Sequence, residues 1–316
     1  MELEQILAPM DPGKFIDEYF GQKPLYIKGT PMKFRTLFNR QRFERACNVA
    51  AQLAPSSTFR LSALVESFDG TLSRTEPITP DQITSVFDAG LSICVNDISL
   101  GDEELAAVCA LVKRRINFAG WVRCNSYLSP DGSGADTHFD TSISTTLQIE
   151  GNKRWRYAEK PAIGWPRSNA QLRRDGTRQW SLPWVGYQPW EELGPVHQSQ
   201  FNEVVLEPGD VLCLSAGTWY SVKAIGHSLA LNMAFAPATG FTVLMHILEP
   251  LLEQNEAWRG GPPATYAPEP DAEQLPANVR QYIAARLYEV CETLSAVDLD
   301  SEFVRRVWSE LVEAPE

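Results

Sequence analysis

The sequence lacks an apolar run long enough to cross a membrane, and its first residues, Met1-Glu2-Leu3-Glu4, supply neither a basic nor an apolar leader segment. A spanning helix needs about 20 mostly apolar residues, and a secretory signal combines a basic segment with an apolar one. These absences predict a cytoplasmic protein with no membrane partner.

Paired cysteines are also missing. The six cysteines are scattered, and no two form a Cys-x-x-Cys pair: Cys47, Cys94, Cys109, Cys124, Cys213 and Cys291. Structural zinc sites and disulfide frameworks need more regular spacing. We therefore expect reduced thiols that belong to the core.

The sequence has fewer basic than acidic residues. The chain has 28 Lys and Arg against 40 Asp and Glu, a formal net charge of −12. An acidic surface repels phosphate, which argues against a nucleic-acid partner. It attracts basic proteins or peptides but also simply favours solubility, and the sign of the charge does not choose between these roles. The 44% apolar and 22% charged composition is that of a folded globular protein.

The chain divides into a mixed helical region at 1–118, a strand-rich region at 119–240 and a helical region at 241–316. Helical spacing is expected around 14–20, 79–90 and 102–115, with a short strand at 24–27. Strands are predicted at 121–128, 137–149, 153–158, 202–206, 211–215, 218–224 and 228–236. Many short strands separated by turns favour a sandwich or small barrel.

Residues 161–200 interrupt the strand pattern and carry four tryptophans: Trp165, Trp180, Trp184 and Trp190. Irregular segments of this length in a compact domain are often functional. Trp165 and Trp184 are candidates for a substrate groove, but the four rings could equally cap the barrel mouth as a small satellite core. The apolar stripes at 279–294 and 303–311 can form a homodimer interface or pack on their own barrel.

The sharpest chemical feature is His138-Phe139-Asp140. In a strand, residues i and i+2 project to one face, so the imidazole and the carboxylate can bind one metal ion. Two such ligands and a third form the facial triad of non-haem Fe(II) oxygenases. Polar residues share the parity of this pair, as expected for a site wall: Ser142, Ser144, Thr146 and Gln148. Lys153 begins the next predicted strand and is suited to a small-molecule carboxylate.

With these residues in view, the sequence resembles the JmjC/cupin-like 2-oxoglutarate oxygenases, and most of all the bacterial ribosomal oxygenase group. Four segments carry the resemblance: 17–27, 138–158 with its Gly151-Asn152-Lys153-Arg154-Trp155, Glu207-Pro208-Gly209-Asp210, and Ser228-Leu229-Ala230-Leu231-Asn232. It covers about residues 11–236, with 161–200 poorly matched. The implied fold is mainly β, a double-stranded β-helix (jelly-roll) flanked by N-terminal and C-terminal helical segments.

The resemblance also implies site roles. His138 and Asp140 would bind Fe(II), and Lys153 would hold the distal carboxylate of 2-oxoglutarate as the co-substrate. Asn232 would lie near the co-substrate, and the hydroxyls of Tyr127 and Ser129 would reach its carboxylate. Tyr127 could equally be ordinary barrel packing.

Tyr220 occupies the position of the family's third metal ligand, a histidine. Three alternatives follow: Tyr220 binds the metal as a phenolate, it hydrogen-bonds a water in that position, or the site has lost much of its iron affinity. His227 is a less favoured substitute. If Asn232 faces inward, His227 has the opposite parity and points outward unless a bulge near Gly226 reverses it.

Two functions remain open at this point. The first is an Fe(II)- and 2-oxoglutarate-dependent dioxygenase that hydroxylates a C–H bond of a protein, peptide or small molecule. The second is a divergent metal-binding protein of the same fold, with activity altered or lost because of Tyr220. Lys153 and Asn232 favour the enzyme, since a pure scaffold gives them no reason to accompany the His/Asp pair.

Overall fold

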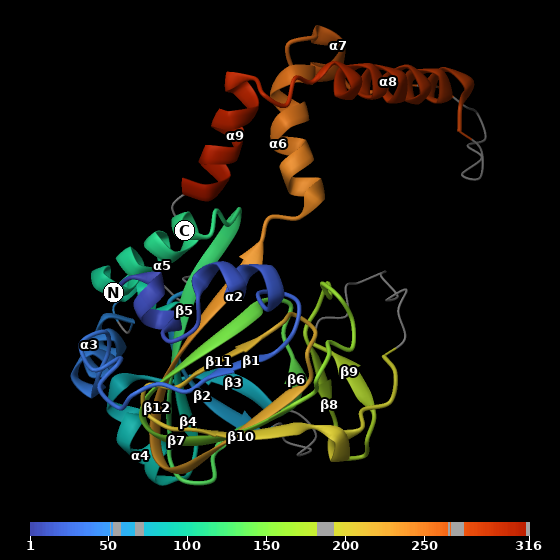
Figure 1. The fold of residues 1–316 in the computed structure, drawn as a ribbon. Helices are drawn as coiled ribbons and strands as arrows, with labels where there is room; N and C mark the ends of the chain where they lie inside the picture. Colours follow the sequence, from blue (N-terminus) through green and yellow to red (C-terminus); the bar gives the residue numbers. More distant parts are fainter. Residues whose placement is uncertain are drawn as a thin grey trace. The chain divides into compact units, whose positions relative to one another are not determined.

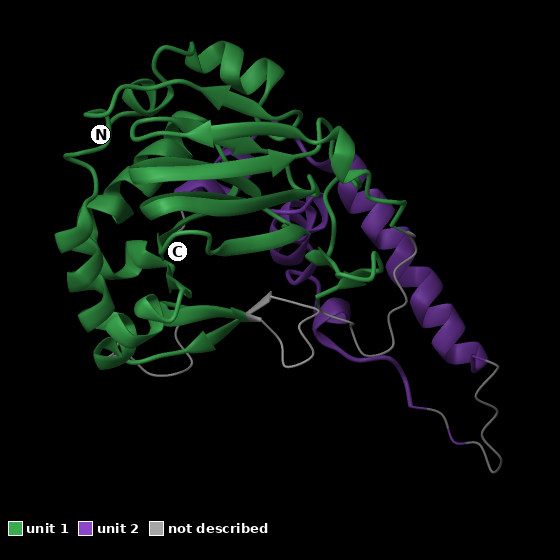
Figure 2. Ribbon diagram, turned by 90° about the horizontal axis from the view of Figure 1, so that it is seen from below, with its two compact units in different colours: residues 1–237, 316 green, residues 238–315 purple. Residues whose placement is uncertain are grey.

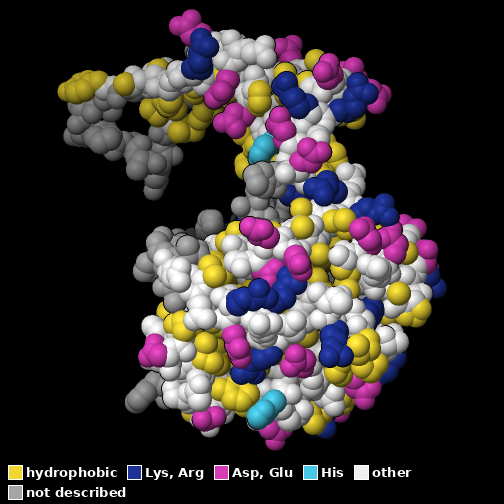
Figure 3. Space-filling model, turned by 90° about the vertical axis from the view of Figure 1, so that its left-hand side faces the viewer, with side chains coloured by type: hydrophobic (Ala, Val, Ile, Leu, Met, Phe, Trp, Pro, Cys, Tyr) yellow, Lys and Arg dark blue, Asp and Glu magenta, His cyan; other side chains and the backbone are white. Residues whose placement is uncertain are grey.

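The computed structural model describes residues 1–50, 52, 58–66, 73–181, 193–264, 266 and 275–313. The chain forms two compact units, residues 1–237 and 238–315 (Figure 2). Within the described residues, no helix is long and apolar enough to cross a membrane. On the face shown in Figure 3, acidic and basic side chains alternate without a large patch of one sign.

Short helices precede and interrupt the strands of the first unit. They are α1 (Leu3–Leu7), α2 (Pro12–Glu18), α3 (Arg40–Ala50), α4 (Ile83–Asp88) and α5 (Glu103–Arg115), with 3₁₀ turns η1 (Pro80–Gln82), η2 (Ile98–Gly101) and η3 (Gln198–Gln200). Side-chain caps start three of them: Asp11 accepts from the Lys14 backbone N–H, Asn39 from that of Arg42, and Asp102 from that of Leu105.

Twelve strands form one sheet folded on itself (Figure 1). They are β1 (Leu25–Ile27), β2 (Arg60–Glu66), β3 (Ser73–Pro77), β4 (Ser92–Asn96), β5 (Gly120–Ser129), β6 (Gly134–Phe139), β7 (Ile143–Tyr157), β8 (Ala170–Leu172), β9 (Arg178–Trp180), β10 (Asn202–Leu206), β11 (Val211–Leu214) and β12 (Tyr220–Pro237). The main path runs β1-β11-β7-β12-β5-β4-β2-β3. Strands β1 to β4, from the predicted N-terminal region, thus extend the sheet beyond 119–240.

The predicted breaks between strands 137–149 and 153–158, and between 218–224 and 228–236, are bends within continuous strands. This corrects the expected division of the strands. Strand β7 runs through Gly151-Asn152, and β12 runs through Gly226 with shifts in its register against β7. Gly151 has φ 62°, and a Cβ there would lie 1.9 Å from the His227 carbonyl oxygen. Glycine lets the two strands approach and bend together at a corner of the barrel.

Side-chain parity separates an apolar outer layer from a more polar barrel interior. Val122, Ile143 and Phe235 pack with the helices in the largest core cluster. Figure 1 shows α2 and α5 lying over this side of the strands. The opposite parity points inward, where the Ser144 hydroxyl donates to Asn232 Oδ1 at 3.0 Å. The predicted polar face is therefore present, although residues 140–142 break the predicted strand 137–149 into β6 and β7.

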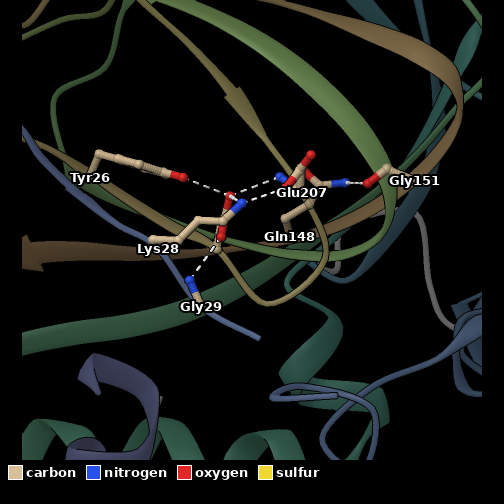
Figure 4. A network of polar contacts seen from close by, with 7 residues as sticks. Tyr26, Lys28, Gly29, Gln148, Gly151 and Glu207 are labelled. Carbon is tan, nitrogen blue, oxygen red and sulfur yellow. Dashed lines mark hydrogen bonds and ion pairs between the residues drawn. The ribbon is translucent and has the colours of Figure 1, made fainter. Parts of the chain in front are cut away.

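A buried carboxylate fixes β1 to the β10–β11 turn. Asp210 accepts hydrogen bonds from the Tyr26 hydroxyl at 3.0 Å and the Gly29 N–H at 2.8 Å. Glu207 donates its backbone N–H to the same side chain at 3.0 Å, and Lys28 forms an ion pair with it at 3.4 Å. Figure 4 shows these contacts. Both oxygens of this carboxylate accept hydrogen bonds, and the network closes this side of the barrel.

The long segment before β10 forms the small hairpin β8–β9 and a satellite core. Phe139, Ala170, Leu193 and Trp219 are buried there, and Trp180 packs against them. Trp180 therefore caps the barrel, whereas Trp165 is 56% exposed with φ 52°. Trp184 and Trp190 lie outside the described residues.

The second unit is helical. It contains α6 (Gly240–Leu252), α7 (Glu256–Arg259), α8 (Ala277–Ala296) and α9 (Glu302–Glu313). Thr239 and Asn255 cap α6 and α7. None of the 20 residues of α8 is buried, and Ile283, Leu287 and Leu294 are exposed.

Candidate metal and co-substrate site

His138 lies on β6, and Tyr220 starts the neighbouring strand β12 directly opposite it. The two rings are 4.3 Å apart between centroids. His138 Nδ1 is 2.7 Å from the Asp136 carbonyl oxygen. That carbonyl can only accept, so the proton belongs on Nδ1 and the Nε2 lone pair is left for a metal ion.

Asp140 follows β6 directly, and a different residue orients each of its carboxylate oxygens. The Tyr220 hydroxyl donates to Oδ2 at 2.6 Å, and the Asn169 amide donates to Oδ1 at 3.1 Å. The backbone N–H of Thr141 donates to Asn169 Oδ1 at 2.8 Å, which fixes the amide orientation. Asn169 was not among the residues predicted from the sequence, because it lies in the irregular segment and its spacing from Asp140 gives no signal.

Lys153 is 4% exposed, and its Nζ lies 5.5 Å from the centre of the Tyr127 ring. Burial lowers the pKa of this amine to about 8. Across the described ranges, no carboxylate forms an ion pair with Lys153. A buried cation without an acidic partner is costly in a core, but it suits a pocket that receives an anion.

Tyr127 connects the two parts of the site. Desolvation raises the pKa of Tyr127 well above 10, and Cys94 and the charge of Asp140 raise it further. Burial, Asp140 and Tyr127 likewise raise the pKa of Tyr220. Both phenols are therefore neutral hydrogen-bond donors at neutral pH in the metal-free protein.

The remaining predicted site residues, Asn232, Ser129 and His227, lie in different environments. Asn232 is 8% exposed and faces inward, opposite Asn125 on β5. Ser129 is buried and accepts from the Ser92 hydroxyl at 2.9 Å. His227 is exposed and packs edge-on against Phe87 at 5.0 Å between ring centres. This exposed position lies outside the barrel interior, on the side that strand parity predicts for His227.

The donor set fits a divalent metal and a carboxylate ligand together. His138 and Asp140 provide nitrogen and oxygen ligands suited to non-haem iron. The described part of the chain has no group of three His, Cys, Asp or Glu residues that could hold a metal. Tyr220 lies beside His138 and contacts Asp140, so its phenol is the candidate for the third protein donor.

A comparison with protein-family models matches residues 105–242 to the JmjC domain. Residues 105–242 thus match the JmjC domain, and the structure has the JmjC/cupin fold, a mainly antiparallel β core carrying helical segments at both ends. Its expected fold class is confirmed.

Among curated proteins, the uncharacterized protein YxbC of Bacillus subtilis is 24% identical over 262 residues, 81% of this chain and 77% of that protein. The bifunctional lysine-specific demethylase and histidyl-hydroxylase NO66 of Drosophila persimilis is 25% identical over 255 residues, 79% of this chain. The match spans 34% of NO66, so the chain corresponds to about a third of that protein.

Among solved structures, Escherichia coli ycfD superposes with a TM-score of 0.60 at 14% identity, covering 96% of this chain and 72% of that one. The ribosomal oxygenase YcfD in complex with cobalt and 2-oxoglutarate gives a TM-score of 0.57 at 13% identity, with coverage of 96% and 71%. At these identities the likeness establishes the shared fold.

Proposed function

We propose that this chain is an Fe(II)- and 2-oxoglutarate-dependent oxygenase that hydroxylates a C–H bond. The observation that carries the proposal is the buried Lys153, which pairs with no carboxylate of the described residues and shares the barrel interior with His138 and Asp140. A dicarboxylate would neutralise this ammonium while its other end approaches the metal position. The cobalt and 2-oxoglutarate complex of YcfD supports the same ligand pair.

Each protein group then has a defined task. His138 Nε2 and one oxygen of Asp140 would hold the metal, and Asn169 and Tyr220 would orient the carboxylate. Lys153 would bind the distal carboxylate over the Tyr127 ring. Iron with 2-oxoglutarate supplies oxygen activation coupled to decarboxylation of the co-substrate to succinate.

A protein or peptide side chain is the proposed substrate class. NO66 is named for activity on lysine and histidine residues, and YcfD is named a ribosomal oxygenase. Trp165 is 56% exposed, and Trp121 is 37% exposed with the Arg123 guanidinium 4.6 Å above its ring. Exposed aromatic residues of this kind suit the capture of a peptide side chain. We infer a cytoplasmic location for this reaction.

The test uses Mn(II) as a redox-inert metal in calorimetric titrations. Wild-type protein is expected to bind Mn(II) first and then 2-oxoglutarate. His138→Ala should lose metal binding, while Lys153→Ala should retain metal but lose 2-oxoglutarate. Lys223→Ala, an exposed β12 lysine paired with Asp136 at 3.0 Å, is the control and should bind both. If metal-loaded wild-type protein does not bind 2-oxoglutarate, the oxygenase proposal is refuted.

A second function is a divergent metal-binding protein without oxygenase activity. The Tyr220–Asp140 bond favours this alternative, because a neutral phenol is a poorer ligand than the imidazole of the resembled family. This alternative predicts metal binding without consumption of 2-oxoglutarate. Measuring succinate in the presence of oxygen separates the two functions.

We also propose that the protein forms a homodimer through its helical region. The exposed residues Ile283, Leu287 and Leu294 lie along one stripe of α8, a helix with no buried residue. A second copy would bury this stripe. Light scattering coupled to gel filtration is expected to give twice the chain mass, and Leu287→Glu should halve it. A monomeric wild type refutes the dimer but leaves the oxygenase proposal intact.

A further inference from the structure

Cys94 differs from the other buried cysteines. Cys47, Cys109, Cys124 and Cys213 belong to the largest apolar core cluster. Cys94 is 3% exposed but belongs to none of the apolar clusters formed by the described residues. Its surroundings are polar, so a role in core packing does not account for it.

The strand register places Cys94 on the inner wall of the barrel. It pairs with Tyr127 of β5 on one side and Ser62 of β2 on the other. Directly paired residues of antiparallel strands point to the same face. The thiol therefore shares the interior with Tyr127, the residue that lies beneath Lys153.

A series of polar contacts runs through this thiol. Cys94 Sγ donates to Asn96 Oδ1 at 2.9 Å, and the Tyr127 hydroxyl contacts both the thiol and the Asn125 amide. The backbone N–H of Asp97 donates to Asn125 Oδ1 at 2.9 Å, so the Asn125 NH₂ group is left to face Tyr127. The tyrosine proton is then directed toward Cys94.

The anchor of this series is itself held in place. Asp97 has φ 54°, an uncommon backbone conformation for a residue with a side chain. Its carboxylate accepts from Thr58 at 2.8 Å and Ser99 at 3.1 Å, and pairs with Arg123 at 3.4 Å. Burial raises the pKa of Cys94 to about 12, so it acts as a neutral thiol.

We propose that Cys94 is a positioning residue of the carboxylate pocket, holding the Tyr127 hydroxyl so that the ring supports Lys153 in its binding position. This inference rests on the proposed function. It assigns to Cys94 no contact with the metal and no part in bond making or breaking.

The test measures metal and co-substrate binding separately, by calorimetry on Mn(II)-loaded protein. Cys94→Ala removes the thiol contact and is expected to weaken 2-oxoglutarate binding about tenfold, the effect of one lost hydrogen bond. Its Mn(II) affinity should stay within about twofold. Cys94→Ser keeps a donor and an acceptor, so it should restore most of the affinity. Cys213→Ala on β11 is the control and should leave 2-oxoglutarate affinity unchanged.

A double-mutant cycle shows whether Cys94 acts through Tyr127. Tyr127→Phe removes the hydroxyl, so adding Cys94→Ala to it should weaken 2-oxoglutarate binding no further. Additive losses would overturn the inference, as would equal losses of metal and 2-oxoglutarate affinity in Cys94→Ala. Unchanged 2-oxoglutarate affinity in Cys94→Ala would do the same. Failure of the proposed function is distinct, because wild-type protein would then bind no 2-oxoglutarate.

Discussion

The Tyr220 hydroxyl donates a 2.6 Å hydrogen bond to Oδ2 of Asp140. Tyr220 occupies the position of the expected third ligand, so the bond links that residue to the carboxylate that would bind the metal. It gives Tyr220 a defined role in the metal-free protein, because a partly buried carboxylate needs donors. It also places a neutral phenol where the resembled family has an imidazole. The metal site therefore depends on two strong ligands and the groups that orient them.

Removing the Tyr220 hydroxyl tests this role. In Tyr220→Phe, Asp140 loses one of its two side-chain donors, and Mn(II) affinity is expected to fall about tenfold, the range for partners that orient metal ligands. Tyr157→Phe on the neighbouring strand is the matched control. A loss approaching that of Asp140→Ala would instead assign Tyr220 as a direct metal ligand. In that case a phenolate charge-transfer band should develop with Fe(III).

Asn169 gives an independent test of the Asp140 environment. Asn169→Ala is expected to lower metal affinity about tenfold by freeing Oδ1. Asn169→Asp places a second carboxylate beside Asp140, and its repulsion should raise the pKa of the pair. Metal binding by this variant should therefore become more pH-dependent between pH 5 and 7 than in wild-type protein. Identical pH profiles would contradict the orienting role.

The titration of Lys153 predicts how co-substrate binding depends on pH. A dicarboxylate needs the protonated amine, and the pKa of Lys153 is about 8. Affinity for 2-oxoglutarate should therefore be constant below pH 7 and fall above pH 8, approaching tenfold per pH unit. Lys153→Arg stays charged throughout this range. The ratio of its dissociation constant to that of wild type should fall as pH rises, and a constant ratio would contradict the assignment.

The same buried amine should reduce stability at neutral pH. Its folded pKa of about 8 lies below the unfolded value of about 10.4, so folding disfavours the bound proton. Stability should rise with pH between these values. Lys153→Met removes the penalty, and the free energy of unfolding should increase by about 1–3 kcal/mol. Thermal unfolding at pH 7 measures this, and a destabilised Lys153→Met would show that the ammonium has an unrecognised partner.

Strand periodicity was sufficient to place much of the barrel and its inner face. The alternation around His138 and Asp140 distinguished polar from apolar positions, and His227, which the parity of Asn232 predicts to face outward, is exposed. Continuous strands were divided at Gly151 and Gly226, because a glycine that permits a bend has the same local signal as one in a turn. The residue pattern of one strand predicts its local backbone conformation. Whether that strand bends depends on its contacts with the neighbouring strand.

The groups that complete the site had no comparable signal. Asn169 reaches Asp140 from an irregular segment, and Cys94 reaches Tyr127 through pairing between strands far apart in sequence. Contacts of this kind depend on the register of the folded sheet. A lone asparagine or cysteine in the sequence is indistinguishable from many that have no function.

Anaerobic titration of the iron-loaded protein with 2-oxoglutarate is the direct test of the oxygenase function. We predict a metal-to-ligand charge-transfer absorption band that saturates with 2-oxoglutarate in wild-type protein and is missing from His138→Ala and Lys153→Ala. Admission of oxygen should then bleach the wild-type band and release succinate. An iron-loaded wild-type protein that develops no band and forms no succinate would contradict it.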